Sequence, residues 1–305
     1  MRIRRLVEKW LRAAGVFRVT KRTIQCVETA GLQLRQSWRH LTRGGSGSGR
    51  RLGSVVMFHT GRSGSSVIAD MLGGHPAIHW DGELFNYRLM LWRKRPKYRM
   101  VEASGLIRRR MNLFDKPLYG FEVLSTHLHA GQMEERQFIA ALENLGIEHF
   151  ILLTRRNVLR KLVSNLVARE RGRWRLEARE AAPLTRVHVD TSNLQMASIK
   201  PLVTHIRDTL ADYATLRSAL SSRRCLELVY EDDVHRDPRR AYRRICEFLG
   251  VEYVAAPVRH GRTTPHPLRQ VIENYDEVAQ VMSNTGFEWM LEEGADIATS
   301  TPISR

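Results

Sequence analysis

Apolar and polar positions along the chain follow two periods, which predict strands that alternate with helices. Short apolar runs rich in β-branched residues predict buried strands, and they occupy residues 54–59, 77–80, 118–124, 149–154 and 225–230. Apolar residues spaced three and four apart predict amphipathic helices, and they lie at about 67–74, 134–145, 157–171, 199–222 and 238–249. Strands separated by helices of this length favour an α/β fold with a central parallel β-sheet flanked by helices.

The beginning of the chain follows a different pattern. Residues 1–43 place apolar positions among arginines at near-helical spacing, which predicts a basic amphipathic helical segment. The Gly/Ser run within 44–51 has no side chains to pack, so we expect a flexible linker there. The main domain is then expected at 52–290, followed by a tail at 291–305.

Charge and composition narrow the class of protein. The net charge is +17, but the first 51 residues hold thirteen Lys and Arg against two Glu, so the remaining body is only mildly basic. No apolar run reaches eighteen residues, which excludes a predicted transmembrane helix, and the N-terminus lacks the apolar block of a signal peptide. Cys26, Cys225 and Cys246 are far apart, which indicates a reducing compartment with no disulfide framework and no zinc site. We therefore expect a cytoplasmic protein.

The segment after the first strand has the composition of an anion-binding loop. Two glycines allow a sharp turn in which successive N–H groups converge, and the following helix N-terminus adds partial positive charge. This predicts a phosphate cradle made of Gly61, Arg62, Ser63, Gly64, Ser65 and Ser66. A nucleoside-triphosphatase loop would need Lys where Ser65 stands. The alternative is an ordinary Gly/Ser turn between a strand and a helix.

A second anion site is predicted beyond the strand at 149–154. Arg155 and Arg156 follow this strand directly, and Ser164 comes eight residues after Arg156 on the next helix. Arginine can fork onto phosphate oxygens, and a serine hydroxyl can donate to another. A solvated arginine pair is the alternative, but two anion sites at strand ends together indicate a nucleotide phosphorylated at both ends.

Three segments in this order resemble the sulfotransferases that use 3′-phosphoadenosine-5′-phosphosulfate (PAPS). HTGRSGSS is similar to their 5′-phosphosulfate loop, and LLTRRNVLRKLVSNL is similar to their 3′-phosphate segment. LVYEDDVHRDPRRAYRRICEFLGV resembles their acidic strand end and the helix after it. The resemblance covers roughly residues 54–285 and implies a P-loop-like sheet. Among its branches, GRSGSS followed by HPAIHWDGELFN looks most like the bacterial carbohydrate sulfotransferases, including those that act on lipid-linked sugars.

The resemblance implies in-line transfer of a sulfuryl group from PAPS to a hydroxyl of a carbohydrate or glycolipid, without a metal. Such a reaction needs positive charge at the leaving oxygen and a base at the incoming hydroxyl. Arg62 suits the first role, and Glu83 stands where the carbohydrate branch places a catalytic glutamate; an ordinary surface glutamate is the alternative. The competing bases are His127 and His129, which alternate on a stretch that we interpret as strand-like.

Two further positions enter through the same resemblance. Arg262 lies in a polar loop where relatives close the 3′-phosphate site with a basic loop. Glu122 departs from the pattern, because many relatives carry a lysine there, and it is given no role. The acceptor loops, at roughly 86–117 and 172–198, are irregular and identify no particular acceptor.

Three alternatives remain open at this point. The basic segment 1–43 suits an anionic membrane surface, which would make the protein peripheral at the inner membrane, but it is also compatible with a solvated helix. A nucleotide-dependent kinase is disfavoured by the missing GK[ST]. A basic nucleic-acid-binding protein is possible on charge alone, although no recognised binding motif is present and no nucleic-acid partner is expected.

Overall fold

The computed structural model describes residues 52–85 and 99–292. The predicted basic segment 1–43 and the linker 44–51 lie outside the described residues, as does most of the predicted tail 291–305. Internal contacts separate Gly105–Asp115 from a larger unit that holds the other described residues. The sheet, the cavities and the candidate site all belong to this larger unit, and the domain boundaries stay a prediction.

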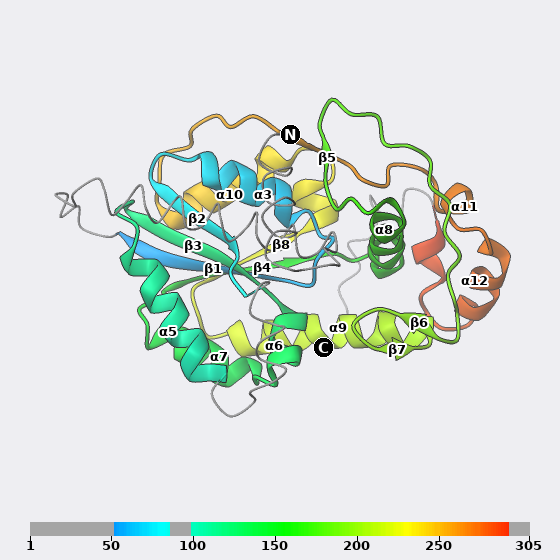
Figure 1. Cartoon of the computed structure of the whole chain (residues 1–305), viewed down its shortest axis with the longest axis horizontal. Coiled ribbons are helices and arrows are strands. Elements are labelled where there is room, and N and C mark those ends of the chain that lie inside the picture. Colours follow the sequence, from blue (N-terminus) through cyan, green and yellow to red (C-terminus); the bar gives the residue numbers. More distant parts are fainter. Residues whose placement is uncertain (1–51, 86–98, 293–305) are drawn as a thin grey trace, which may run out of the picture. The chain divides into compact units, whose positions relative to one another are not determined.

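Five parallel strands form the central sheet, which confirms the predicted α/β class (Figure 1). Their spatial order is β2-β3-β1-β4-β8, and their bounds are β1 Gly53–His59, β2 Ile78–Glu83, β3 Leu118–Leu124, β4 His149–Thr154 and β8 Cys225–Val229. All four neighbouring pairs run parallel. The connection after β1 leads to β2 at one edge of the sheet, and the connection after β4 leads to β8 at the other edge. Ligands of open α/β sheets bind at such a switch point, beyond the carboxyl ends of the strands.

The predicted helices form within a few residues of their expected bounds. They are α3 Ser65–Gly74, α7 Glu135–Glu143, α8 Val158–Arg171, α9 Leu202–Leu220 and α10 Pro238–Leu249. The carboxylate of Asp237 caps α10 by accepting from the N–H of Arg239 at 3.1 Å, and Pro238 follows at the first helical position. Local capping signals of this kind are readable from sequence because both partners lie within one turn.

Two sequence interpretations were wrong. The stretch that holds His127 and His129 is helix α6 (Ser125–Gly131), not a strand, so the two side chains do not share one face. Residues 99–112, expected to be irregular, form helix α5 (Arg99–Asn112). Three successive arginines and Gly105 interrupt the apolar spacing of α5, which hides its helical period.

Helices cover both faces of the sheet (Figure 1). On one face, Val55 and Met57 of β1 belong to the same buried cluster as Ile245 of α10. On the other face, the ring of Phe58 meets that of Phe138 of α7 edge-on, with centroids 6.3 Å apart. Successive residues of β1 thus enter opposite cores, as expected for a central strand that is buried on both sides.

A second apolar cluster is built around α8. It includes residues of α9, α11 (Leu268–Val271), α12 (Tyr275–Met282) and the 3₁₀ turn η3 (Glu288–Leu291). Asn157 ties this cluster to the start of α8. Its side-chain carbonyl accepts from the N–H of Arg160 at 2.9 Å, and its amide donates to the carbonyl of Met290 at 2.9 Å. Two short antiparallel pairs complete the larger unit: β5 (Leu176–Glu177) with β9 (His260–Gly261), and β6 (Leu194–Gln195) with β7 (Ile199–Lys200).

Candidate functional site

The loop between β1 and α3 adopts the conformation of an anion-binding turn. Gly61, Arg62 and Gly64 have positive φ angles of 77°, 56° and 86°. A Cβ atom at Gly64 would lie 2.7 Å from Cγ1 of Val234, so this position requires glycine for space as well as for its dihedral angle. Left-handed residues next to a helix N-terminus form a concave set of backbone N–H groups that favours anions.

Arg62 projects from this loop to α8. Its Nη2 donates to the hydroxyl of Ser164 at 2.8 Å and also to the hydroxyl of Thr263. Its Nη1 donates to the carbonyl of Trp174 at 2.9 Å. Burial and the nearby Arg155 lower the pKa of Arg62 to about 10, which still leaves the guanidinium charged at neutral pH.

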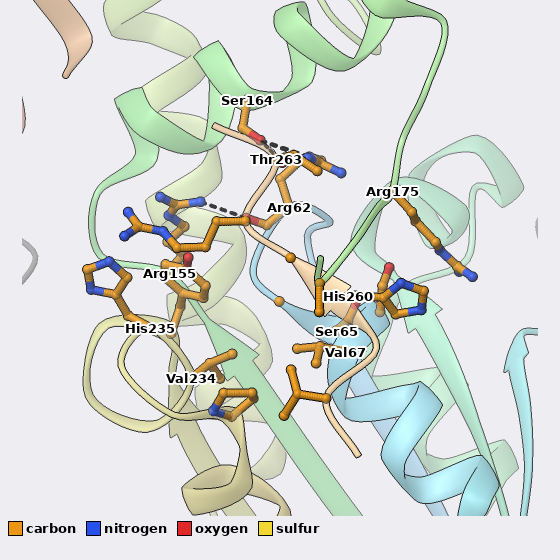
Figure 2. A pocket seen from close by; sticks show the side chains of 18 of the residues that line it. Arg62, Ser65, Val67, Arg155, Ser164, Arg175, Val234, His235, His260 and Thr263 are labelled. Atoms are coloured by element: carbon orange, nitrogen blue, oxygen red, sulfur yellow. Dashed lines mark hydrogen bonds between the residues drawn. The ribbon is translucent and has the colours of Figure 1, made fainter. Parts of the chain in front are cut away.

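Arg155 supports the same loop from the end of β4. Its Nη1 donates to the carbonyl of Arg62 at 3.0 Å (Figure 2). Its guanidinium stacks over the ring of Tyr230, 4.3 Å from the ring centroid. The hydroxyl of Tyr213 connects the two strand ends, because it contacts the Thr60 hydroxyl at 2.6 Å and accepts from the N–H of Arg155 at 3.3 Å. The two predicted anion sites are therefore held side by side.

Arg156, which was predicted to share a phosphate site with Ser164, is paired with an acidic side chain. Its guanidinium forms a two-pronged pair with Asp232, at 2.7 and 2.6 Å. The carboxylate of Glu231 accepts from the N–H groups of Arg156 and Asn157 at 3.0 Å each, which fixes the turn. A small cavity beside Ser164 is lined instead by Arg155, Arg160 and Arg262, together with Ser164, Tyr230, Thr263, Thr264 and Leu268.

A larger cavity, here the first cavity, opens at the start of α3 and has a volume of about 350 Å³. Its lining includes Gly64, Ser65 and Ser66 of the loop. It also includes five arginines and no Asp or Glu, the arginines being Arg62, Arg155, Arg175, Arg236 and Arg262. Figure 2 shows Arg62 and Arg155 on one side of it and Arg175 on another. The cavity is therefore suited to a ligand with more than one negative charge.

Two residues of the predicted cradle do not line this cavity. The side chain of Ser63 is fully buried, and its hydroxyl has no hydrogen-bond partner among the described residues. A Cβ atom at Gly61 would lie against Leu124, 3.6 Å from its Cδ2. The backbone of these residues shapes the turn, and the side chains that reach the cavity are those of Arg62, Ser65 and Ser66.

Glu83, the predicted base, is partly buried at the end of β2, beside the buried side chains of His59 and Glu122. Burial raises the pKa of the Glu83 carboxyl, His59 lowers it, and the like charge of Glu122 raises it further. Arg175, which lines the first cavity, also acts on it electrostatically. Glu83 itself lines neither the first cavity, nor the small cavity, nor the cavity on the α6 side of the loop. A carboxyl whose pKa is raised by burial is typical of groups that accept protons near neutral pH.

His59, Glu83 and Glu122 form a group, found among the described residues, whose ligand atoms lie close enough to share a metal ion, all within 4.8 Å. The contacts of Glu122 explain the cluster in other terms. One of its oxygens accepts from the indole N–H of Trp80 at 3.1 Å, and the other lies 3.1 Å from Nε2 of His59. Because Nδ1 of His59 accepts from the N–H of Gly61 at 3.1 Å, Nε2 carries the proton and faces Glu122. That the site works without a metal stays a prediction.

The two competing histidines have different surroundings. His127 is buried edge-on against Phe85, and burial followed by the neighbouring His59 lowers the pKa of His127 to about 3. His129 is half exposed and lies 3.5 Å from Glu135 and 3.6 Å from Asp212. His129 lines another cavity, here the second cavity, of about 390 Å³ on the α6 and α9 side of the loop.

Comparison with known proteins gives a partial likeness to solved structures. No family model matches the chain, and no curated protein matches it. Among solved structures, the chain is similar to a sulfotransferase from Alicyclobacillus acidocaldarius, at 15% identity and a TM-score of 0.44. The alignment covers 80% of this chain and 98% of the other.

Several cavity residues were not predicted. Trp174, Arg175 and Arg236 line the first cavity. Trp174 and Arg175 stand in an arginine-rich stretch without a motif, whereas Arg236 lies within the third family-like segment but was given no role. Thr263 follows Arg262 in the polar loop already singled out, and it contacts both Arg62 and Ser164. The position of the Thr263 hydroxyl next to Arg262 was the local signal in the sequence that could have pointed to Thr263.

No helix among the described residues is long and apolar enough to cross a membrane.

Proposed function

We propose that the protein is a sulfotransferase, which moves a sulfuryl group from PAPS to a hydroxyl of a carbohydrate or glycolipid. The observation that carries this proposal is the first cavity, where a glycine loop and a helix N-terminus meet five arginines and no carboxylate. The nucleotide left after transfer, adenosine 3′,5′-bisphosphate, has phosphates at both ends and suits such a lining. The motifs that resemble the PAPS-dependent family all border this cavity.

The two predicted phosphate sites would divide the nucleotide between them. The 5′-phosphosulfate would lie on the loop Gly61–Ser66, and the 3′-phosphate would lie near Ser164 and Arg262. The contact between Arg62 and Ser164 supports this division, because it joins the two sites directly. A bound phosphate would take over some of the donors that Arg62 now gives to neighbouring oxygens.

The reaction proposed is a single displacement at sulfur. The acceptor oxygen forms a bond to sulfur while the bond between sulfur and the 5′-phosphate oxygen breaks, so adenosine 3′,5′-bisphosphate leaves with the electron pair. Arg62 would stabilise the negative charge that develops on the leaving oxygen. Glu83 would accept the proton of the incoming hydroxyl, and the raised pKa of its carboxyl suits that role.

Calorimetry on the full chain tests the proposal. Adenosine 3′,5′-bisphosphate should bind roughly ten- to a hundredfold more tightly than adenosine 5′-monophosphate, because charge-assisted contacts to one phosphate are worth about 1.5–3 kcal/mol. The variant Arg217→Ala is a control for these titrations and should bind both nucleotides as the wild-type protein does. Arg217 pairs with Glu227 on the surface of α9, outside the cavities. Equal affinities for the two nucleotides would contradict the assignment. Transfer of radiolabelled sulfur from PAPS to extracted glycolipids and polysaccharides then identifies the acceptor.

The alternatives make different predictions. A kinase would turn over ATP with magnesium, which the full chain can be assayed for directly. A nucleic-acid-binding protein would lose its function on deletion of residues 1–51 and would bind with a steep salt dependence. Under our proposal, deletion of that segment leaves turnover of a water-soluble acceptor intact. We propose in addition that 1–43 holds a cytoplasmic enzyme at an anionic membrane surface, which vesicle sedimentation tests.

A further inference from the structure

The second cavity contains a buried cation with no counter-charge in contact. Lys161 of α8 lines this cavity, and only 9% of its surface is exposed. Within residues 52–85 and 99–292 its side-chain amine makes no hydrogen bond and no ion pair. Burial lowers the pKa of Lys161 to about 8, which leaves the amine largely protonated at neutral pH.

Asn165 places beside Lys161 in this cavity a second polar group, whose hydrogen-bond acceptor no described residue satisfies. It lies four residues after Lys161, so both side chains stand on one face of α8. Asn165 also lines the second cavity, and its buried side-chain carbonyl oxygen has no hydrogen-bond partner in the described part of the chain. The adjacent face of α8, one residue earlier in the chain, carries Arg160 and Ser164, which border the small cavity beside the first. Helix α8 therefore separates a proposed nucleotide side from a second polar cavity.

The other charged groups of the second cavity already have partners. Lys200 is paired with Asp208 at 2.5 Å, and Arg169 donates to the carbonyl of Gln195 at 2.6 Å. Asp212 lies 3.6 Å from His129. Asp212 acts electrostatically on Lys161 but makes no ion pair with it. Lys161 is thus the cation of this lining that is left for a ligand.

The Lys161 side chain is largely buried, and no described protein group replaces the hydration that its amine loses there, which is costly for a charged group. An anionic ligand in the cavity would restore both the hydrogen bonds and the charge balance. The lining holds Arg62, Lys161, Arg169 and Lys200 against Asp208 and Asp212, so its charge balance favours an anion. The single ammonium left without a partner among the described residues matches one carboxylate.

We propose that the second cavity binds the acceptor, and that this acceptor is a sugar acid whose carboxylate pairs with Lys161 and whose neighbouring hydroxyl donates to Asn165. This inference rests on the proposed function. Its placement is supported by Arg62, which lines both cavities and so stands where the transferred group would pass. A volume of about 390 Å³ is within the usual range for small-ligand sites.

The test compares two sugars that differ at one carbon. Methyl β-D-glucuronide carries a carboxylate where methyl β-D-glucoside carries a hydroxymethyl group. Ligand-observed NMR titrations with the full chain, with and without adenosine 3′,5′-bisphosphate, give both affinities. The wild-type protein should bind the glucuronide roughly ten- to a hundredfold more tightly than the glucoside, as expected for a charge-assisted contact.

Two variants locate the contact. Lys161→Met keeps the length of the side chain and removes its charge, so it should fold at least as stably and bind both sugars equally weakly. Asn165→Ala should weaken both sugars while it keeps the preference for the carboxylate. Arg217→Met removes one positive charge from the surface of the neighbouring helix α9 and should leave both affinities unchanged.

Equal binding of the two sugars to the wild-type protein, or binding of neither, overturns the inference. A preference that persists in Lys161→Met overturns the placement at Lys161. If Lys161→Met fails to fold, Asn165→Ala tests the placement in its stead, and unchanged affinities for both sugars in that variant overturn it. The nucleotide titration is read separately. Failure to bind adenosine 3′,5′-bisphosphate counts against the proposed function, whereas nucleotide binding without a carboxylate preference counts against this inference alone.

Discussion

The guanidinium of Arg62 donates to the hydroxyl of Ser164 at 2.8 Å, although 102 positions separate the two residues. Each belongs to a different predicted phosphate site, one on the loop after β1 and the other on α8. The contact makes the two sites a single polar surface with five arginines around it. A nucleotide bound there would be held at both ends by residues that already contact one another.

Arg62→Ala should weaken binding of adenosine 3′,5′-bisphosphate roughly ten- to a hundredfold and should reduce turnover as well. Under the proposed function, the arginine would contribute to ground-state binding of the phosphate and to stabilisation of the leaving group. Calorimetry and a sulfuryl-transfer assay measure the two effects, with Arg217→Ala as the surface control. Unchanged nucleotide affinity would remove Arg62 from the site.

Arg262→Ala should reduce the preference for adenosine 3′,5′-bisphosphate over adenosine 5′-monophosphate more than Arg156→Ala does. Arg262 lines both the first cavity and the small cavity next to Ser164, whereas the guanidinium of Arg156 is paired with Asp232. The ratio of the two nucleotide affinities, measured for each variant, decides whether Arg262 or Arg156 contributes more to binding of the 3′-phosphate. A larger loss for Arg156→Ala would show that Arg156 leaves Asp232 when the nucleotide binds.

Glu83→Gln should lower turnover by roughly 10²–10⁴ and leave nucleotide affinity nearly unchanged. The amide keeps the shape of the side chain but cannot accept the proton. Near-normal turnover with a confirmed acceptor would place the base elsewhere. His129 would then be the first residue to test, because it lines the second cavity, whereas His127 is a weak base with a pKa of about 3.

Glu122→Gln should move the acidic limb of the pH profile of kcat/KM to lower pH. The negative charge of Glu122 raises the pKa of Glu83, so its removal makes ionisation of Glu83 easier. Glu83 acts as a base only when its carboxyl is ionised, so the acidic limb of the profile should shift to lower pH together with the pKa of Glu83. Asp232→Asn, outside this cluster, should leave the limb in place. A limb that stays fixed in Glu122→Gln would assign it to another group.

Gly64→Ala should destabilise the fold by roughly 2–3 kcal/mol, since it combines a left-handed residue with a contact at 2.7 Å to Val234. Gly250 is the matched control. It also has a positive φ angle, but no atom lies within 4 Å of the position that a Cβ atom would take, so Gly250→Ala should cost only about 1 kcal/mol. Urea denaturation measures both. Adding Val234→Ala should recover part of the loss in Gly64→Ala, and equal losses at the two glycines would contradict the steric argument.

The strands were predictable from sequence because each is a short apolar run whose signal is local. The direction of Arg156 was not, because it depends on Asp232, which lies 76 positions further along the chain. The helix at His127 was misread because Thr126-His127-Leu128-His129 alternates like a strand. In the structure, the N–H of Leu124 at the end of β3 donates to Nδ1 of His127 at 3.3 Å and caps a helix. The burial of Glu83 likewise arises from neighbours on other strands.

The amide of Asn157 donates to the carbonyl of Met290, 133 positions later, and this has a consequence for folding during translation. A ribosome that adds about 5–20 residues per second needs roughly 7–27 s to make the intervening chain. Until then, the cap of α8 lacks one of its partners in a site that is fully buried in the finished protein. We expect the start of α8, next to the proposed nucleotide site, to mature late in synthesis, well after the strands β1 to β4 have emerged.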